Sequence, residues 1–178
     1  GRDGRVYYLE EGRFRAPTTE YNTHLRLIQR EVRLNGSRFF AVLHAQPLYL
    51  TYLTHIPAYQ ETMALNRALY RWQAEQIVFY PYGVAYIPFV APGSDALMDL
   101  TNDSDPRCRF IIWGKHGVVS LSDESLLKAQ DSIEYFEAAA QYEYLDLSAG
   151  GPAEGLSNDE LGEICDFKGV TSELLDRL

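Results

Sequence analysis

Two continuous apolar runs constrain the fold of this chain more than any other feature of its sequence. Apart from Arg109, residues 39–43 and 109–113 show none of the alternation between polar and apolar side chains that marks a strand with one face in water. Such strands are typical of a sheet whose two faces are both covered by helices. Segments with helical periodicity surround both runs, so the pattern predicts an α/β protein.

The other expected elements follow from periodicity and from turn residues. The spacing of Leu25, Ile28 and Val32 predicts a helix that starts near Glu20 and ends at residues 35–37. The longest helix is capped by residues 122–124, and its apolar stripe comprises Leu126, Ile133, Phe136, Ala140 and Tyr144. The remaining elements are two short strands within 1–15, helices over 49–54, 57–72 and 94–100, a hairpin of 76–80 with 84–90, a strand over 117–120 and one or two small helices within 158–178.

Helices and strands in this order predict a three-layer α/β/α sandwich with a mixed, partly antiparallel central sheet. A chain of 178 residues is long enough to bury a core of its own. We therefore expect a single domain over residues 1–178.

Composition and charge exclude several classes of partner. The net charge of −9 argues against nucleic acid, because phosphate binding requires clustered Lys and Arg. The one loose cluster, Arg26, Arg30 and Arg33, is interpreted as a solvated helix face. No apolar run approaches the roughly 20 residues that cross a bilayer. Cys108 and Cys165 are interpreted as buried reduced thiols, which are typical of a cytoplasmic protein.

Two histidines stand at the ends of the expected buried strands. His44 follows residues 39–43, and His116 follows residues 109–113 and precedes Gly117. Side chains at i and i+2 of an extended segment point to the same side, so His44 and Gln46 can converge on one point. Taken singly, a histidine at a strand end is more often an ordinary hydrogen-bonded side chain.

A carboxylate in a separate segment completes the candidate group. Glu20 is expected in the first turn of a helix, where the helix dipole alone would favour it. Two His, one Glu and an open position suit Zn²⁺ or another divalent first-row ion in a catalytic arrangement. His24 lies four residues after Glu20 on the same helix face and either supports that carboxylate or has a surface role.

Several linked segments together resemble the class II aldolase and adducin family. Residues 17–20, 42–46 and 113–118 carry the candidate metal site in the family's order, and further similarity extends over 71–84, 87–94, 121–140 and 156–161. The similarity covers residues 17–170. Within the family these segments are most similar to the L-rhamnulose-1-phosphate aldolases.

The resemblance implies a homotetramer of α/β/α subunits with sites between subunits. It implies Zn²⁺-dependent, reversible cleavage of a ketose 1-phosphate, L-rhamnulose 1-phosphate, to dihydroxyacetone phosphate and L-lactaldehyde. His44 and His116 match metal ligands, and Gln46 stands where the family has another ligand histidine. Glu20 matches the residue that shuttles a proton, and Glu75 matches a carboxylate that reaches a neighbouring subunit's site.

Two departures from the family pattern keep alternatives open. Gln46 is a weaker donor than histidine, and the family's N-terminal phosphate-binding portion has no counterpart in this sequence. The first alternative is a non-catalytic, adducin-like oligomeric interaction module. The second is a related enzyme that acts on sugar phosphates, such as an epimerase or a fuculose-phosphate aldolase.

Overall fold

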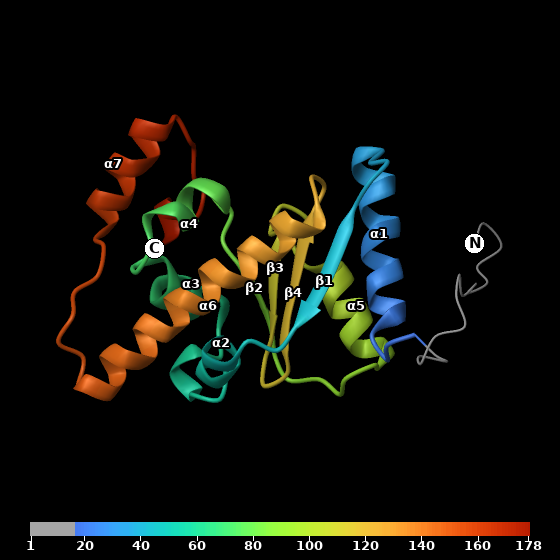
Figure 1. The fold of residues 1–178 in the computed structure, drawn as a ribbon, viewed down its shortest axis with the longest axis horizontal. Helices are drawn as coiled ribbons and strands as arrows, with labels where there is room; N and C mark the ends of the chain where they lie inside the picture. The colour runs from blue at the N-terminus through green and yellow to red at the C-terminus, as the bar shows by residue number, and fades with distance from the viewer. Residues whose placement is uncertain (1–16) are drawn as a thin grey trace.

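A four-stranded mixed sheet forms the centre of the molecule (Figure 1). The computed structural model describes residues 17–178, so the strands expected within 1–15 lie outside the described residues. The strand order is β1 (Ala41–Ala45), β4 (Gly117–Ser122), β3 (Phe110–Trp113) and β2 (Ala85–Ile87). β4 is antiparallel to both β1 and β3, whereas β2 runs parallel to β3. The prediction of a mixed, partly antiparallel sheet is confirmed.

Helices cover both faces of this sheet, as expected for strands that are buried throughout. On one face, α1 (Tyr21–Asn35) and α5 (Asp95–Asp103) pack through Leu27 and Leu97 onto Ile111 and Val119. The other face packs against α6 (Leu126–Ala149), together with α2 (Leu48–Leu53), α3 (Thr62–Tyr70) and α4 (Ala74–Phe79). Figure 1 shows the two helical layers on either side of the strands. The α/β/α sandwich is confirmed.

The remaining elements are η1 (Pro57–Tyr59), α7 (Asn158–Lys168) and η2 (Leu175–Arg177). The helix expected from residue 57 to 72 is split, because Glu61 caps a new helix and accepts hydrogen bonds from the N–H groups of Met63 and Ala64. Cys108 and Cys165 are both free and buried, as predicted. Within residues 17–178 no helix has the length and apolar character needed to cross a membrane.

The expected hairpin of residues 76–80 and 84–90 is wrong. Residues 76–79 belong to α4, and β2 pairs with β3 instead. The apolar run Ile77–Phe79 is too short for periodicity to distinguish a strand from a helix. In addition, the Asn66 side chain occupies the position of a strand partner: its Nδ2 donates to Val84 O at 3.0 Å, and Val84 N–H donates to its Oδ1 at 2.9 Å.

The interpretation of the α1 surface is wrong at two points. The helix buries Leu27 rather than the expected stripe, and Val32 is 51% exposed. Arg30 is buried instead of solvated, because its guanidinium donates to Asn102 O at 2.8 Å and to Ser104 O at 3.1 Å at the end of α5. Carbonyl groups at a helix C-terminus attract cations, and this attraction stabilises the buried Arg30 guanidinium. Arg26 and Arg33 are exposed, as predicted.

The prediction of the longest helix is confirmed, but its N-cap lies just after the expected residues 122–124. Ser125 is the N-cap of α6, and the Ser122 hydroxyl accepts hydrogen bonds from the N–H groups of Glu124 and Ser125 just before the helix. Leu126, expected on the apolar stripe, is 57% exposed, whereas Phe136 and Ala140 lie in the core.

Candidate active site

The structure brings His44 and His116 together at one end of the sheet. Antiparallel pairing of β1 with β4 places His44 opposite Val119, and His116 lies in the turn that leads from β3 into β4. The centroids of the two imidazole rings are 5.0 Å apart, with an angle of 61° between the ring planes. Histidines that are 72 residues apart in sequence therefore meet because both flank the same central strand.

A backbone carbonyl fixes the tautomer of His44. Its Nδ1 lies 2.9 Å from Val118 O, and because a carbonyl can only accept, Nδ1 carries the proton and donates. Nε2 is then left with its lone pair available. Histidines that bind metals are commonly oriented by a hydrogen bond of this kind from the other ring nitrogen.

His116 is half-buried, and its Nδ1 has no hydrogen-bond partner among the described residues. Burial lowers the pKa of its imidazole, the neighbouring His44 lowers it further, and the Glu20 carboxylate acts in the opposite direction. A lowered pKa favours the neutral ring at neutral pH, which is the form that donates a lone pair.

Trp113, which the sequence analysis did not single out, forms the apolar wall of this pair. Its ring centroid lies 4.9 Å from that of His44 and 5.1 Å from that of His116. The indole is buried, and its Nε1–H donates to Thr101 Oγ1 at 3.0 Å. The sequence signal that could have found Trp113 was its place at the end of an expected buried strand, three residues before His116.

Glu20 lies beside the histidines on the N-terminal side of α1. It is the N-cap residue rather than a first-turn residue, and it is only 3% exposed. Its Oε2 accepts from Gly93 N–H at 3.2 Å, and its Oε1 accepts from the Thr19 hydroxyl at 3.3 Å. The carboxylate is therefore buried and oriented, and it is near enough to His116 and His24 to raise the pKa of each.

His24 belongs to the same group. Burial lowers its pKa most, His44 lowers it further, and Glu20 opposes both effects. Its Nε2 is buried and has no hydrogen-bond partner among residues 17–178. Of the two predicted roles for His24, support of the Glu20 carboxylate therefore fits better than a surface role.

Gln46 follows β1 and is exposed next to the pair. Gly117 makes room for it: a Cβ built on Gly117 would collide with Ala45 O and would lie 3.1 Å from Gln46 Cγ and 3.2 Å from His44 Cε1. Only glycine fits at this close approach of β1 to the turn.

Glu75 is not brought to the histidines within this chain. It lies exposed in the first turn of α4, and Figure 1 shows α4 well away from the C-terminal end of β1. Its role at a neighbouring subunit's site stays a prediction.

Across residues 17–178 no three His, Cys, Asp or Glu side chains are close enough to hold a metal ion together. The donors that fit an ion are thus the imidazoles of His44 and His116, with the Gln46 amide adjacent.

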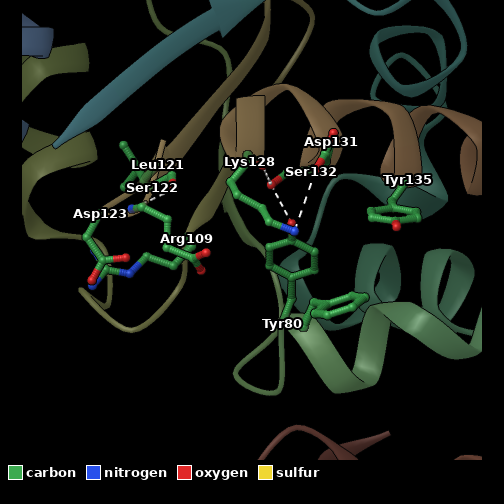
Figure 2. A pocket seen from close by; sticks show the side chains of 11 residues that line it. Tyr80, Arg109, Leu121, Ser122, Asp123, Lys128, Asp131, Ser132 and Tyr135 are labelled. Carbon is green, nitrogen blue, oxygen red and sulfur yellow. Dashed lines mark hydrogen bonds and ion pairs between the residues drawn. The ribbon is translucent and has the colours of Figure 1, made fainter. Parts of the chain in front are cut away.

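A separate cavity of about 390 Å³ lies at the opposite end of the sheet (Figure 2). Its lining includes Arg109, Ser122 and Lys128, and none of the candidate site residues. The Arg109 guanidinium is 2.8 Å from the Glu31 carboxylate, and the Lys128 ammonium is 3.8 Å from Asp131. Because both cations already have acidic neighbours, this cavity offers no excess positive charge to an anionic substrate.

Comparison with known proteins decides the family. The family described as "Class II Aldolase and Adducin N-terminal domain" matches residues 2–144. The chain belongs to this family. A rhamnulose-1-phosphate aldolase from Mannheimia succiniciproducens is 26% identical over 170 residues, which are 94% of this chain and 62% of that protein. One from Pectobacterium carotovorum is 28% identical over 174 residues, which are 95% of this chain and 62% of that protein.

Solved structures agree with the fold. The sugar-phosphate aldolase from Thermotoga maritima superimposes with a TM-score of 0.67 at 30% identity, over 75% of this chain and 56% of that one. An L-fuculose 1-phosphate aldolase matches with a TM-score of 0.56 at 20% identity, over 86% of this chain and 65% of that one, which supports the fold alone. The chain spans about three fifths of the length of the curated relatives that it matches.

Proposed function

We propose that this chain carries the metal-binding site of a class II aldolase that reversibly cleaves a ketose 1-phosphate, L-rhamnulose 1-phosphate, to dihydroxyacetone phosphate and L-lactaldehyde. The observation that supports it best is the imidazole pair: two rings 5.0 Å apart, one with its Nε2 lone pair made available by the Val118 carbonyl. Membership of the family and similarity to rhamnulose-1-phosphate aldolases supply the substrate class.

In this proposal His44, through Nε2, and His116 hold a divalent ion, Zn²⁺ or a similar metal, with the Gln46 amide oxygen as a third donor. Such an ion supplies Lewis-acid stabilisation of the negative charge that develops when the carbon–carbon bond breaks. An amide oxygen is a weaker and harder donor than imidazole, so we expect lower affinity for Zn²⁺ than a three-histidine site would have. Trp113 closes one side of the pair with an apolar surface.

Glu20 is the proposed general acid and base at the carbon atom that changes protonation. Its burial and its two hydrogen bonds hold the carboxylate in one orientation beside the histidines. Glu75 is proposed to accept the proton of the cleaved hydroxyl at a neighbouring subunit's site within a homotetramer. Groups that bind the substrate phosphate are proposed to come from a portion of the longer relatives that this sequence does not include.

The alternative is an adducin-like interaction module without chemistry. The observation that favours it is the lack, across residues 17–178, of three acidic, cysteine or histidine ligands that converge on one point. Gln46, in place of a third histidine, points the same way.

Metal analysis separates these two functions. We expect the purified protein to bind close to one Zn²⁺ per chain, and His44→Ala or His116→Ala to lose it. His55→Ala is the matched control, because His55 is exposed and follows α2 outside the imidazole cluster. Protein that binds no divalent ion, under conditions where His55→Ala and wild type are both folded, would favour the module.

A cleavage assay with L-rhamnulose 1-phosphate tests the role of Glu20. Loss of a general acid–base group costs roughly 10²- to 10⁴-fold in rate, so Glu20→Gln should lower the cleavage rate at a fixed substrate concentration by at least about 10²-fold and leave Zn²⁺ content unchanged. Aldehyde release is measured with a coupled reductase. Cleavage that is unaffected by Glu20→Gln contradicts the assignment.

A further inference from the structure

The turn that carries His116 has an unusual backbone conformation. Gly114, Lys115 and His116 join β3 to β4 beyond the Trp113–Gly117 pair, and His116 N–H donates to Trp113 O at 3.1 Å. Lys115 has φ of +60°, and among the described residues it is the one non-glycine residue with positive φ. A side chain other than Gly, Asn or Asp seldom adopts this left-handed conformation, so an outside contact is needed to hold it.

That contact comes from Thr54, on a different part of the chain. Lys115 N–H donates to Thr54 Oγ1 at 2.7 Å, and the Thr54 hydroxyl donates to Thr51 O at 2.6 Å. Thr54 is completely buried. Because the hydroxyl proton is used toward Thr51, the oxygen lone pair is directed to the Lys115 amide, and solvent does not compete for it.

Thr54 is itself held on a fixed support. It is the C-cap residue of α2, and the first N–H groups of that helix, from Tyr49 and Leu50, donate to the Glu137 carboxylate on α6, both at 2.9 Å. The Thr54 hydroxyl is thus positioned by α2 and α6, two helices that pack on the sheet. Residues 114–116, in contrast, lie in the turn beyond the ends of β3 and β4.

His116 depends on this turn because no hydrogen bond among the described residues fixes its Nδ1. Its ring rests on Trp113. The position of the ring therefore depends on the backbone on which it stands, together with this stacking contact. We propose that Thr54 is a positioning residue that orients His116 toward His44 by holding Lys115 in the left-handed conformation. This inference rests on the proposed function, because the orientation of His116 toward His44 matters only if the two imidazoles bind a metal ion.

The first test is Zn²⁺ affinity, measured by competition with a chromophoric chelator on the metal-free full chain. Thr54→Val keeps the shape and removes the hydroxyl, and the loss of an orienting partner typically lowers metal affinity by roughly 10- to 100-fold. Thr54→Ser restores the hydroxyl and should return affinity to within about twofold of wild type. Thr51→Val is the matched control on the same helix, because the Thr51 hydroxyl has no partner among residues 17–178.

A second test needs no metal. Hydrogen exchange should show the Lys115 amide protected in wild type and roughly tenfold or more faster in Thr54→Val. The ring resonances of His116 should shift or broaden, while the indole N–H resonance of Trp72, which is bonded to Glu143, stays in place. Thr54→Ser and Thr51→Val should leave both signals unchanged.

The outcomes distinguish the two proposals. Wild-type protein that binds no Zn²⁺ refutes the metal site, and the positioning role of Thr54 is then judged on the metal-free signals alone. Thr54→Val with unchanged Zn²⁺ affinity and unchanged His116 resonances overturns the positioning role even if the metal site stands. Should Thr54→Val fail to fold, an unprotected Lys115 amide in the wild type overturns it equally.

Discussion

At the scale of single residues, the chemistry of the site is set by the nearest neighbours of each side chain. The Val118 carbonyl determines which nitrogen of His44 is free, and the buried indole of Trp113 keeps both rings in an apolar setting. Burial has a comparable effect elsewhere in the chain. It raises the pKa of the Cys108 thiol from 9.0 to about 11, and the thiol donates weakly to Tyr82 O.

The Cys108 shift predicts a loss of stability at high pH. The unfolded chain releases the thiol proton near pH 9, whereas the folded chain retains it until about pH 11. The unfolded state therefore binds fewer protons in this window, and the free energy of unfolding falls as pH rises through it. Urea unfolding between pH 8 and 11 should show a smaller decline for Cys108→Ala than for wild type. Parallel declines in the two proteins would show that Cys108 is not responsible.

Local sequence rules made His44, His116 and Glu20 candidates because each stands at the end of an element that periodicity could locate. Trp113 and Thr54 escaped them, since their importance depends on contacts between segments far apart in the chain. No rule based on spacing predicts that a threonine at the end of α2 will meet an amide 61 residues later. Glu75 was chosen by resemblance, and within the described residues it lies away from the pair.

At the scale of elements, α2 is stabilised from outside. Pro47 occupies its N-cap position and provides no side-chain hydrogen bond, so Glu137 on α6 caps the helix through Tyr49 N–H and Leu50 N–H. This charged cap sits where the positive end of the helix dipole favours a carboxylate. It fixes α2, and with it Thr54, against the sheet.

Removal of this cap should destabilise the whole chain. Loss of a helix cap costs about 0.5–2 kcal/mol, and two unsatisfied amides place Glu137→Ala toward the upper end of that range. Glu134→Ala, one turn earlier on an exposed face of α6, should change the free energy of unfolding by less than about 0.5 kcal/mol. Equilibrium urea unfolding of both variants measures the difference. Equal effects of the two substitutions would remove the capping role.

Most element types followed from the sequence, and the errors have a physical cause. α4 was taken for a strand because a run of three apolar residues fits either period, and its helical form depends on burial of Gln76 and Ile77 against the rest of the fold. The stripe on α1 was displaced because Arg30 and Glu31, polar in sequence, are buried by partners on other elements. Arg30 reaches carbonyls at the end of α5, and Glu31 pairs with Arg109 at 2.8 Å.

At the scale of the whole molecule, one ionic network joins the C-terminal segment to the body. Glu143 on α6 accepts from Arg71 Nε at 3.0 Å and from Trp72 Nε1 at 2.8 Å, while Asp146 accepts from Arg71 Nη2 at 3.0 Å. Asp146 also accepts from Ala153 N–H, and the Arg71 carbonyl accepts from Leu156 N–H. Arg71 therefore holds residues 153–156 against the body of the protein, directly through its carbonyl and indirectly through Asp146.

We expect Arg71→Met to loosen this segment. Removing one partner of a buried ion pair leaves uncompensated carboxylates and costs up to about 3–5 kcal/mol, reduced here because Arg71 is partly exposed. Limited proteolysis should cut within 150–157 faster than in wild type, and urea unfolding should show a loss of roughly 2 kcal/mol. Arg107→Met is the control, since its exposed pairs with Asp105 and Glu173 are screened by solvent and should contribute little to stability.

The layered architecture was predictable because strands that are apolar on both faces require covers on both sides. The order of the strands was not, since the parallel pairing of β2 with β3 depends on how the segment from β2 through α5 crosses the sheet. The family resemblance anticipated the arrangement of layers that the solved relatives share.

The place of β4 at the centre of the sheet has a consequence for how the imidazole pair can come apart. His44 is on β1, which pairs with β4, and His116 is the residue immediately before β4. Fraying of the chain ends or of outer helices leaves that junction intact. In thermal unfolding of the wild-type chain, the two rings should therefore separate in the same transition that dissolves the sheet.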